Sequence, residues 1–369
     1  MGSTGSESTV PRTASGAGVA GPRPTEVGAG GGRVRIAVDV LGGDRAPEEI
    51  VAGAAAASSS DIEPILFGPP GLDTRGLRLR ETTETIEMDD HAVESVRAKP
   101  DSSLVRSVRA VADGDADAVV SAGNTGAMLA ASLLHIRRLA GVHRPGIAAV
   151  IPTRRGPSVL IDAGANADAR PEHLVQFGHM GAVFAEEILG IPEPEVRLLS
   201  IGEEAEKGSQ LTREAHELLR GSSLRFCGNT EGRMILEGAA DVVVADGFSG
   251  NIALKTIEGT VRSLLASLRG ELDSSVRGKL GGLLIRPSAR RLRDRLDPET
   301  YGGGYLLGLR GLVVIAHGAS SRVAIANAIE LAARGVEHGV VDRLQERLAR
   351  QTVSPHVLSS RSTTPTAER

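Results

Sequence analysis

The fold of this chain is decided at residues 34–44, where the sequence reads VRIAVDVLGGD. The β-branched residues up to Val40 predict a buried strand, and the two glycines that follow predict a turn. An Ala-rich run from Pro47 to Ala57 then predicts a helix, because proline is well accommodated in the first turn of a helix. The same order of strand, polar turn and helix recurs along the chain.

Five further segments predict strands that end at polar turns. They are residues 117–121, 158–161, 196–201, 241–245 and 312–316. Helices are expected after several of these turns, including one from Pro171 to Leu189. Strands that alternate with helices form parallel sheets through right-handed crossovers. The expected fold class is therefore α/β, with a mostly parallel sheet sandwiched by helices.

Polar residues stand at or just past the end of each expected strand. They are Asp39, Ser121, Asp162, Glu203, Asp246 and His317. Ligands of α/β proteins bind beyond the carboxyl ends of the strands, so we expect these six positions to converge on one cleft. The alternative is that they only form turns and cap helices.

Composition narrows the function. Aromatic residues make up only 2% of the 369 residues, which argues against binding nucleic acid by base stacking. A formal net charge of −4 argues against a general polyanion partner. The single cysteine, Cys227, allows no internal disulfide and no cysteine-based zinc site, which favours the reducing cytoplasm. No apolar run approaches the roughly 20 residues that span a bilayer.

The ends of the chain differ in composition from its middle. Residues 1–32 are rich in Gly, Ser, Thr and Pro, and residues 351–369 in Ser, Thr and Pro, so both are expected to be disordered tails. We expect a single α/β catalytic domain over residues 33–350, with a helical protrusion at about residues 255–297.

Common catalytic motifs do not occur in this sequence. It contains no Walker phosphate loop, no His-Glu-x-x-His and no Gly-x-Ser-x-Gly, and its histidine spacing supports no metal site. Most positive charge is carried by arginine, with only four lysines: Lys99, Lys207, Lys255 and Lys279. Where arginine is the default, a retained lysine indicates either a place that needs a compact point charge or chance.

Eight sequence blocks together carry a resemblance. They are DVLGGDRAP (39–47), KPDSS (99–103), SAGNTG (121–126), DAGAN (162–166) with PEHL (171–174), IGEEAEKG (201–208), GNTEG (228–232), DVVVADGFSGNIALKTIEG (241–259) and YGGGYLLGLRGLVVIAHGAS (301–320). In this order they closely resemble the PlsX family of bacterial phosphate acyltransferases of phospholipid synthesis, over roughly residues 33–350. The block at 241–259 is the most specific.

The resemblance implies a reaction, in which a fatty acyl group moves from acyl carrier protein thioester to inorganic phosphate. Acyl phosphate for phosphatidic acid synthesis and free carrier protein are the products. It also implies a fold similar to isocitrate and isopropylmalate dehydrogenases and phosphotransacetylases, a homodimer, no cofactor, and cytoplasmic location with peripheral membrane association. A glycerol-3-phosphate acyltransferase would act downstream. Departures from the family pattern at Val40, Leu41, Arg45 and Ser200 leave its acidic and glycine positions intact.

The chemistry of this reaction suits the residues present. Phosphate is largely ionised near neutral pH, so it needs a cradle, alignment and an oxyanion site rather than a serine or cysteine nucleophile. We expect the cradle at the helix start after residues 123–126, because helix N-termini favour anions. The cradle residues are Gly123, Asn124, Thr125 and Gly126, assisted by Lys255 and Lys207.

We expect other residues near this cradle to contact the thioester carbonyl oxygen and the departing thiolate. Asn251 and Ser249 are candidates for the carbonyl oxygen, and His317 for protonating the departing thiolate. The aspartates, including Asp246, are expected to orient the lysines and cap the turns. The cleft is expected to be lined by Asp39, Gly42, Gly43, Asp44, Asp162, Asn166, Glu203, Asn229 and Glu231.

Residues 277–295 hold seven basic residues against one acidic residue. Within them we expect an apolar tip at a bend between two helices, formed by Leu280, Leu283, Leu284 and Ile285. With Arg286, Arg290 and Arg291 beside it, this pattern indicates contact with anionic lipid or with acidic carrier protein. The alternative is a solvated helix pair with a buried leucine stripe.

Three rival functions remain open from the sequence. The first is a phosphotransacetylase that uses a coenzyme A thioester, and the second is a nicotinamide-dependent decarboxylating dehydrogenase, which the lack of a metal-binding carboxylate cluster disfavours. The third is a membrane-recruited scaffold of lipid synthesis, without catalysis.

Overall fold

A computed structural model describes residues 32–296 and 298–352. The tails expected at residues 1–32 and 351–369 lie, apart from residues 32, 351 and 352, outside the described residues.

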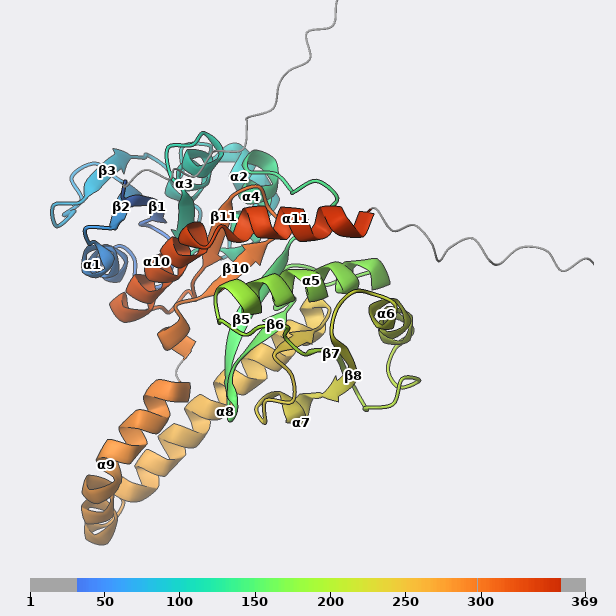
Figure 1. The fold of residues 1–369 in the computed structure, drawn as a ribbon. Coiled ribbons are helices and arrows are strands. Elements are labelled where there is room, and N and C mark those ends of the chain that lie inside the picture. The colour runs from blue at the N-terminus through green and yellow to red at the C-terminus, as the bar shows by residue number, and fades with distance from the viewer. Residues whose placement is uncertain (1–31, 297, 353–369) are drawn as a thin grey trace, which may run out of the picture.

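Eleven strands form one sheet in the described part of the chain (Figure 1). They are β1 (Val34–Asp39), β2 (Ile62–Gly68), β3 (Arg78–Glu81), β4 (Ala118–Ser121), β5 (Gly146–Thr153), β6 (Gly156–Ile161), β7 (Val196–Ser200), β8 (Phe226–Glu231), β9 (Val242–Val244), β10 (Gly304–Leu307) and β11 (Leu312–Ile315). The strands expected from the sequence are confirmed as β1, β4, β6, β7, β9 and β11, with ends shifted by two residues at most.

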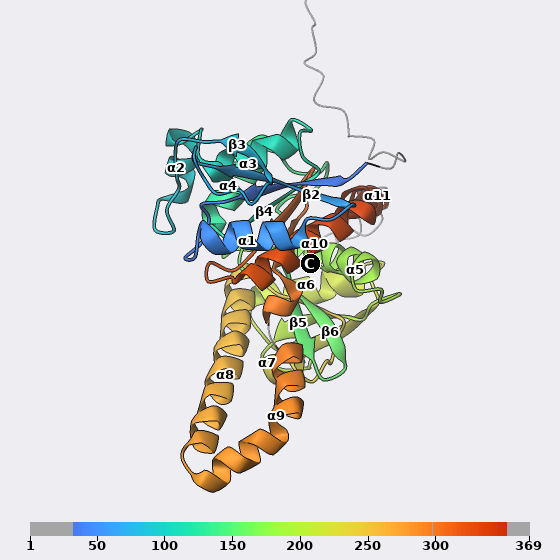
Figure 2. The same ribbon diagram turned by 90° about the vertical axis from the view of Figure 1, so that its left-hand side faces the viewer.

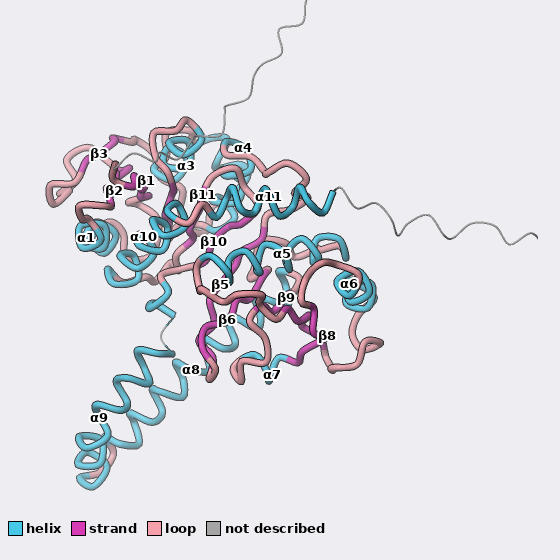
Figure 3. Tube along the Cα trace, in the orientation of Figure 1, coloured by secondary structure: helices cyan, strands magenta, loops and turns pink. Residues whose placement is uncertain are grey.

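Helices connect these strands and cover the sheet. They are α1 (Glu48–Ala57), α2 (Ala92–Ala98), α3 (Ser103–Ala112), α4 (Thr125–His135), α5 (Pro171–Glu187), α6 (Gln210–Arg220), α7 (Gly232–Ile235), α8 (Gly247–Asp273), α9 (Val276–Leu296), α10 (Arg322–Glu337) and α11 (Val340–Thr352), with a 3-10 turn at Pro298–Tyr301. Figure 3 shows the strands running between these helices.

The sheet has two parallel halves that run in opposite directions. The strand order is β3-β2-β1-β4-β11-β10-β5-β6-β9-β7-β8. The strands from β3 to β11 in this order are parallel to one another, as are those from β6 to β8. Between the halves, β10 is antiparallel to both β11 and β5, and β5 is antiparallel to β6. The expected α/β class with a mostly parallel sheet is confirmed.

This reversal corrects one expectation. The six polar positions do not share one edge of the sheet, because the two halves present their carboxyl ends at opposite edges. Asp39, Ser121 and His317 follow β1, β4 and β11 at one edge. Asp162, Glu203 and Asp246 follow β6, β7 and β9 at the other.

Each face of the sheet has its own apolar core. Ile36 and Val38 of β1 belong to the core on the face that α1, α5, α6, α10 and α11 cover, whereas Ala37 between them belongs to the core on the face of α2, α3 and α4. This alternation is what a strand buried on both faces requires. A smaller cluster on β6 and β9, which includes Leu160 and Val243, packs against Leu254 and its neighbours in α8. Helices α4 and α8 therefore lie on the same face, since Leu254 also contacts the core that holds α4.

Helices α8 and α9 pack side by side and project from the rest of the molecule (Figure 2). The bend between them falls after Asp273, so Leu280–Ile285 lie inside α9 rather than at the bend expected from the sequence. The apolar side chains of that segment are nevertheless exposed: Leu280 by 61%, Leu283 by 63% and Leu284 by 76%. None of the described helices combines the length and apolar character needed to cross a membrane.

Candidate active site

A buried carboxylate organises the loops at the end of β1. Asp39 is 1% exposed and accepts hydrogen bonds from the hydroxyls of Ser103 at 2.5 Å and Ser121 at 2.6 Å. Burial raises the pKa of Asp39, and the two serine hydrogen bonds act in the opposite direction. Gly42 is required beside it, because a β-carbon there would lie 2.5 Å from Asp39 Oδ2 and 2.7 Å from the Gly123 nitrogen. Asp39 thus joins the loop after β1 to the loop after β4.

The start of α4 presents free amides. Ser121 Oγ accepts from the Gly123 amide at 3.0 Å, and Asn124 Oδ1 caps the helix by accepting from the Ala127 amide at 3.0 Å. Among the described residues, no protein group accepts from the amides of Thr125 and Gly126. Both residues are exposed. Two amides at a helix N-terminus, next to a threonine hydroxyl, are suited to bind an anion.

The loop after β11 lies against the same loops. The Asp44 amide donates to the Gly318 carbonyl at 2.8 Å, and His317 Nδ1 accepts from the Ala319 amide at 3.1 Å. Partial burial lowers the pKa of His317, and the positive charge of Lys255 lowers it further. A neutral ring whose Nδ1 accepts a hydrogen bond carries its proton on Nε2 and has that N–H available as a donor.

At the opposite edge, the loop after β6 holds the start of α8. Asp162 is fully buried and accepts from the amides of Gly164, Ala165 and Asn166 at 2.8 to 3.1 Å. Burial raises the pKa of Asp162, and the hydrogen bond from Ala165 is the largest effect in the opposite direction. Helix α8 packs so closely that a β-carbon at Gly250 would lie 2.0 Å from the Asp162 carbonyl oxygen.

Helix α8 connects the two edges. Its N-cap Asp246 accepts from the Ser249 amide at 2.9 Å, and Asn251 lies against Gly164. One turn further on, Lys255 forms an ion pair with Glu258 at 3.0 Å. Lys255, Glu258 and Asp44 all act electrostatically on His317. The helix therefore begins at the edge of Asp162 and carries Lys255 to the loops of the other edge.

A third group lies on β8 and in the loop that follows β7. Asn229 donates to the Glu204 carbonyl at 2.8 Å and faces His216 Nδ1 at 2.9 Å, and Glu231 pairs with Arg233 at 2.7 Å. Lys207 is exposed and packs on Gly202 in the same loop as Glu203. Within residues 32–296 and 298–352, no side-chain hydrogen bond or ion pair links this group to the loops around Asp39 or to α8.

These positions correct parts of the sequence-based site. Asp39 and Asp162 are buried, so their side chains do not line a cleft surface; they hold turns instead. None of Asp39, Asp162 and Asp246 forms a hydrogen bond or ion pair with a lysine among the described residues, so their expected role in orienting the lysines stays a prediction. Their expected capping of turns is confirmed.

Sequence reasoning missed two contributors to this site. They are Ser103, which contacts Asp39, and the turn at residues 87–90, whose Met88 and Asp90 carbonyls accept from Asn124 Nδ2 at 3.0 Å and 3.2 Å. The KPDSS block at 99–103 was the available signal for Ser103. Nothing in the local sequence of residues 87–90 marks them as partners of a loop more than 30 residues away.

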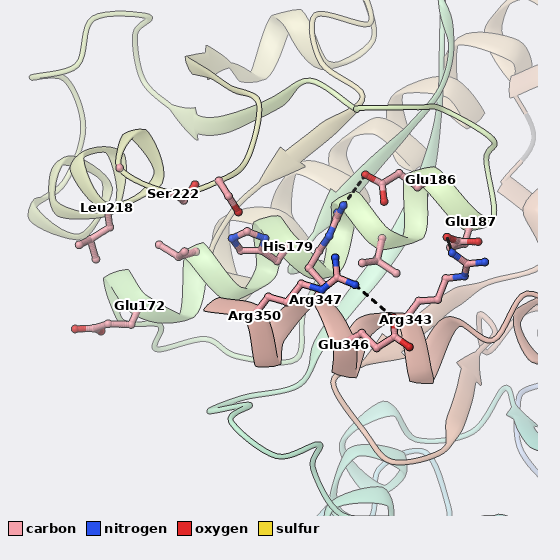
Figure 4. Close-up of a pocket in the computed structure, with 14 residues that line it drawn as sticks. Glu172, His179, Glu186, Glu187, Leu218, Ser222, Arg343, Glu346, Arg347 and Arg350 are labelled. Atoms are coloured by element: carbon pink, nitrogen blue, oxygen red, sulfur yellow. Dashed lines mark hydrogen bonds and ion pairs between the residues drawn. The ribbon is translucent and has the colours of Figure 1, made fainter. Parts of the chain in front are cut away.

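The large cavity in Figure 4 lies on the other face of the sheet, between α5, the end of α6 and α11. Its volume is about 970 Å³, and its charges are largely paired within it, with Arg347 on Glu186 at 3.0 Å and Arg343 on Glu187 at 3.2 Å. His179 lies at its floor and is 2% exposed. We do not place the reaction there, because the free amides and Lys255 lie on the opposite face.

No cluster of three potential metal ligands occurs in the described part of the chain. The buried carboxylates Asp39 and Asp162 already accept hydrogen bonds from serine hydroxyls or backbone amides.

Comparisons with known proteins agree with the resemblance stated above. A family model described as fatty acid synthesis protein matches residues 34–343. A phosphate acyltransferase of Desulfitobacterium hafniense (strain Y51) is 46% identical over 332 residues, covering 87% of this chain and 99% of that protein. The phosphate acyltransferase of Heliobacterium modesticaldum is 44% identical over 327 residues, covering 85% of this chain and 98% of that protein.

Solved structures resemble the fold. A phosphotransacetylase from Streptococcus pyogenes matches with a TM-score of 0.55 at 20% identity, over 83% of this chain and 94% of that chain. A branched-chain phosphotransacylase from Enterococcus faecalis V583 matches with a TM-score of 0.54 at 17% identity, over 83% of this chain and 99% of that chain. The expected similarity to phosphotransacetylase folds is confirmed.

The buried His179 gives a pH prediction for the cavity wall. Burial lowers its pKa from 6.5 to about 4. Between pH 6.5 and about pH 4, His179 therefore binds a proton in the unfolded chain but stays neutral in the folded chain. The unfolding free energy should therefore fall as pH falls, by about 2 kcal/mol at pH 5. We expect His179→Gln to remove this loss, measured by urea unfolding at pH 7 and pH 5. His338→Gln, at an exposed histidine, should follow the wild type; equal losses in all three proteins would contradict the prediction.

Proposed function

The chain belongs to the fatty acid synthesis protein family, and from that membership we propose that it transfers a fatty acyl group from acyl carrier protein thioester to inorganic phosphate. The acyl phosphate formed would enter phosphatidic acid synthesis. Family members named phosphate acyltransferase support the acceptor, and the chain is an acyltransferase. The carrier-protein donor and the pathway are our proposals.

One observation carries the assignment of the phosphate site: the free amides of Thr125 and Gly126 at the start of α4. Phosphate is ionised enough near neutral pH to attack without a general base, so binding and alignment are what the protein must supply. Helix N-termini supply amide donors and a favourable dipole for an anion. Lys255 adds a cation that acts on His317, the neighbour of these loops.

The remaining roles follow from the position of each group. Neutral His317, with its Nε2 proton available, is a donor for the departing thiolate or for the developing oxyanion. Asn251 and Ser249, on the first two turns of α8, are the candidates for the carbonyl oxygen. The electrostatic effect of Lys255 on His317 supports its place beside the phosphate cradle, whereas Lys207 lies with Glu203 in the third group.

The hairpin of α8 and α9 is the proposed contact with the membrane. Leu280, Leu283 and Leu284 of α9 are exposed, and basic residues including Arg286 and Arg290 follow them on the same helix. Apolar side chains beside basic ones suit the surface of an anionic bilayer on its cytoplasmic side. The same basic side chains would also suit acidic carrier protein.

A homodimer is proposed from the same hairpin. Leu264 and Leu268 are one turn apart on α8 and are 67% and 44% exposed. Such an apolar stripe on a projecting helix supports pairing with a second copy of the chain.

The proposed reaction is tested by supplying the purified protein with acyl carrier protein thioester, with and without inorganic phosphate. We expect thioester loss and acyl-phosphate formation only when phosphate is present. An acyl-coenzyme A thioester of the same chain length is the comparison donor. Faster transfer from coenzyme A would favour a phosphotransacetylase, and no phosphate-dependent thioester loss with either donor would favour a scaffold.

Lys255→Ala tests the cradle. Removing its charge should raise the KM for phosphate about 10-fold or more and lower kcat by about 10²-fold, in the range seen when one stabilising group is lost. Steady-state kinetics with phosphate varied measures both. Arg269→Ala, at an exposed cation on the same helix, is the control and should behave as wild type. Unchanged phosphate affinity in Lys255→Ala would show that the cradle is assigned wrongly.

The membrane contact is tested by flotation with liposomes that contain anionic lipid. The double variant Leu283→Glu, Leu284→Glu places two charges on the exposed apolar surface of α9, so it should lose most of its binding. The wild type should float, and less so at high salt, since the basic flank is screened. Flotation of the double variant at the wild-type level would remove the membrane proposal.

A further inference from the structure

The KPDSS block at residues 99–103 has no role in the reaction as proposed. It lies between α2 and α3, and both helices pack against α4, the helix that presents the free amides (Figures 1 and 2). Each of its charged and hydroxyl side chains forms hydrogen bonds with a different part of the structure. Two of these contacts begin paths of hydrogen bonds that lead to α4.

The first path begins at Lys99. Its Nζ donates to Asp90 Oδ2 at 2.6 Å, and the same oxygen accepts from the Glu87 amide at 3.0 Å. The hydrogen bonds between Glu87 and Asp90 close the turn at residues 87–90, and the ion pair ties this turn to Lys99. Asn124 Nδ2 donates to the carbonyls of that turn, at 3.0 Å to Met88 and 3.2 Å to Asp90. Asn124 is the N-cap of α4, so the turn fixes the side chain that begins the helix.

The second path begins at Ser103. Its hydroxyl donates to Asp39 Oδ1 at 2.5 Å, and Ser121 Oγ donates to Asp39 Oδ2 at 2.6 Å. Ser121 Oγ in turn accepts from the Gly123 amide at 3.0 Å. Ser103, Asp39 and Ser121 are each 1% exposed, so solvent does not replace these bonds.

The residues between Lys99 and Ser103 anchor the segment itself. Asp101 accepts from the Thr83 amide at 3.0 Å and from the Thr83 hydroxyl at 2.7 Å, and it pairs with Arg106 at 2.5 Å. Ser102 is the N-cap of α3 and accepts from the Val105 amide. The segment from which both paths start is therefore itself held in place.

The two paths end at adjacent residues, Gly123 and Asn124, immediately before the free amides of Thr125 and Gly126. We infer that Lys99 and Ser103 are positioning residues for the phosphate site, which set the direction of these amides without touching phosphate. The inference rests on the proposed function. Displacements of about 1 Å in a site that works by alignment cost about 10²-fold in rate, so remote anchors of this kind affect catalysis.

Steady-state kinetics of Lys99→Met and Ser103→Ala, with phosphate and the acyl donor varied separately, tests this. We expect the KM for phosphate to rise about 5- to 10-fold in each variant, with the KM for the acyl donor within about twofold of wild type, because only the anion-binding amides are displaced. Lys99→Arg, which retains a donor for Asp90, and Ser103→Thr, which retains the hydroxyl, should restore most of the phosphate affinity.

Arg106→Met is the matched control. It breaks an ion pair of the same segment that leads to neither Gly123 nor Asn124, and it leaves both hydrogen bonds from Thr83 to Asp101 in place, so the segment should stay anchored and the KM for phosphate unchanged. An unchanged KM for phosphate in Lys99→Met and Ser103→Ala would overturn the inference. So would an equal rise in Arg106→Met, since it would indicate general loosening of the segment.

Amide hydrogen exchange gives a readout that does not depend on activity. Exchange at residues 123–128 should be faster in Lys99→Met than in wild type and unchanged in Arg106→Met. Asp90→Asn removes the partner of Lys99 and should give the same result if Lys99→Met does not fold. Wild-type protein without phosphate-dependent transfer would refute the proposed function, whereas unchanged exchange in Lys99→Met and Asp90→Asn would refute the positioning role.

Discussion

The reversal of strand direction at β10, β5 and β6 is the constraint on which the rest of this structure depends. It sends the carboxyl ends of the two halves of the sheet to opposite edges, so loops at the two edges cannot meet through the strands alone. Helix α8 makes the connection, because it begins beside Asp162 and places Lys255 near His317. The proposed site thus needs a helix that crosses the sheet face, and its first turn must approach β6 closely.

Buried carboxylates hold the loops at both edges of the sheet. A carboxylate removed from water is costly unless hydrogen bonds compensate for the loss of solvation. Asp162 obtains them from three consecutive loop residues, and Asp39 from two serines that are far apart in sequence. Each carboxylate therefore fixes several backbone segments at once. Apolar side chains would fill the same space without specifying the direction of an amide.

The sequence predicted those elements of the fold that depend on neighbouring residues alone. The strand at 34–40 and the helix from Pro171 follow from residue types and spacing, and the structure has both. Strand direction in the middle of the sheet depends on pairing between β5 and β10, which are more than 140 residues apart, so no local pattern reports it. The predicted bend of the hairpin was also misplaced: Gly281 and Gly282 suggest a turn, but α9 continues through both residues and the bend falls after Asp273.

Within the candidate site, the sequence predicted only those contacts that a side chain makes with residues close to it in the chain. Asn124 as a helix cap follows from its place after β4, whereas its second role, holding the carbonyls of Met88 and Asp90, appears only in three dimensions. An amide side chain can do both because its oxygen accepts while its nitrogen donates. A serine or aspartate would still cap the helix but would not donate to two carbonyls. The identity of Asn124 is therefore set by the turn at 87–90 as much as by the helix that it begins.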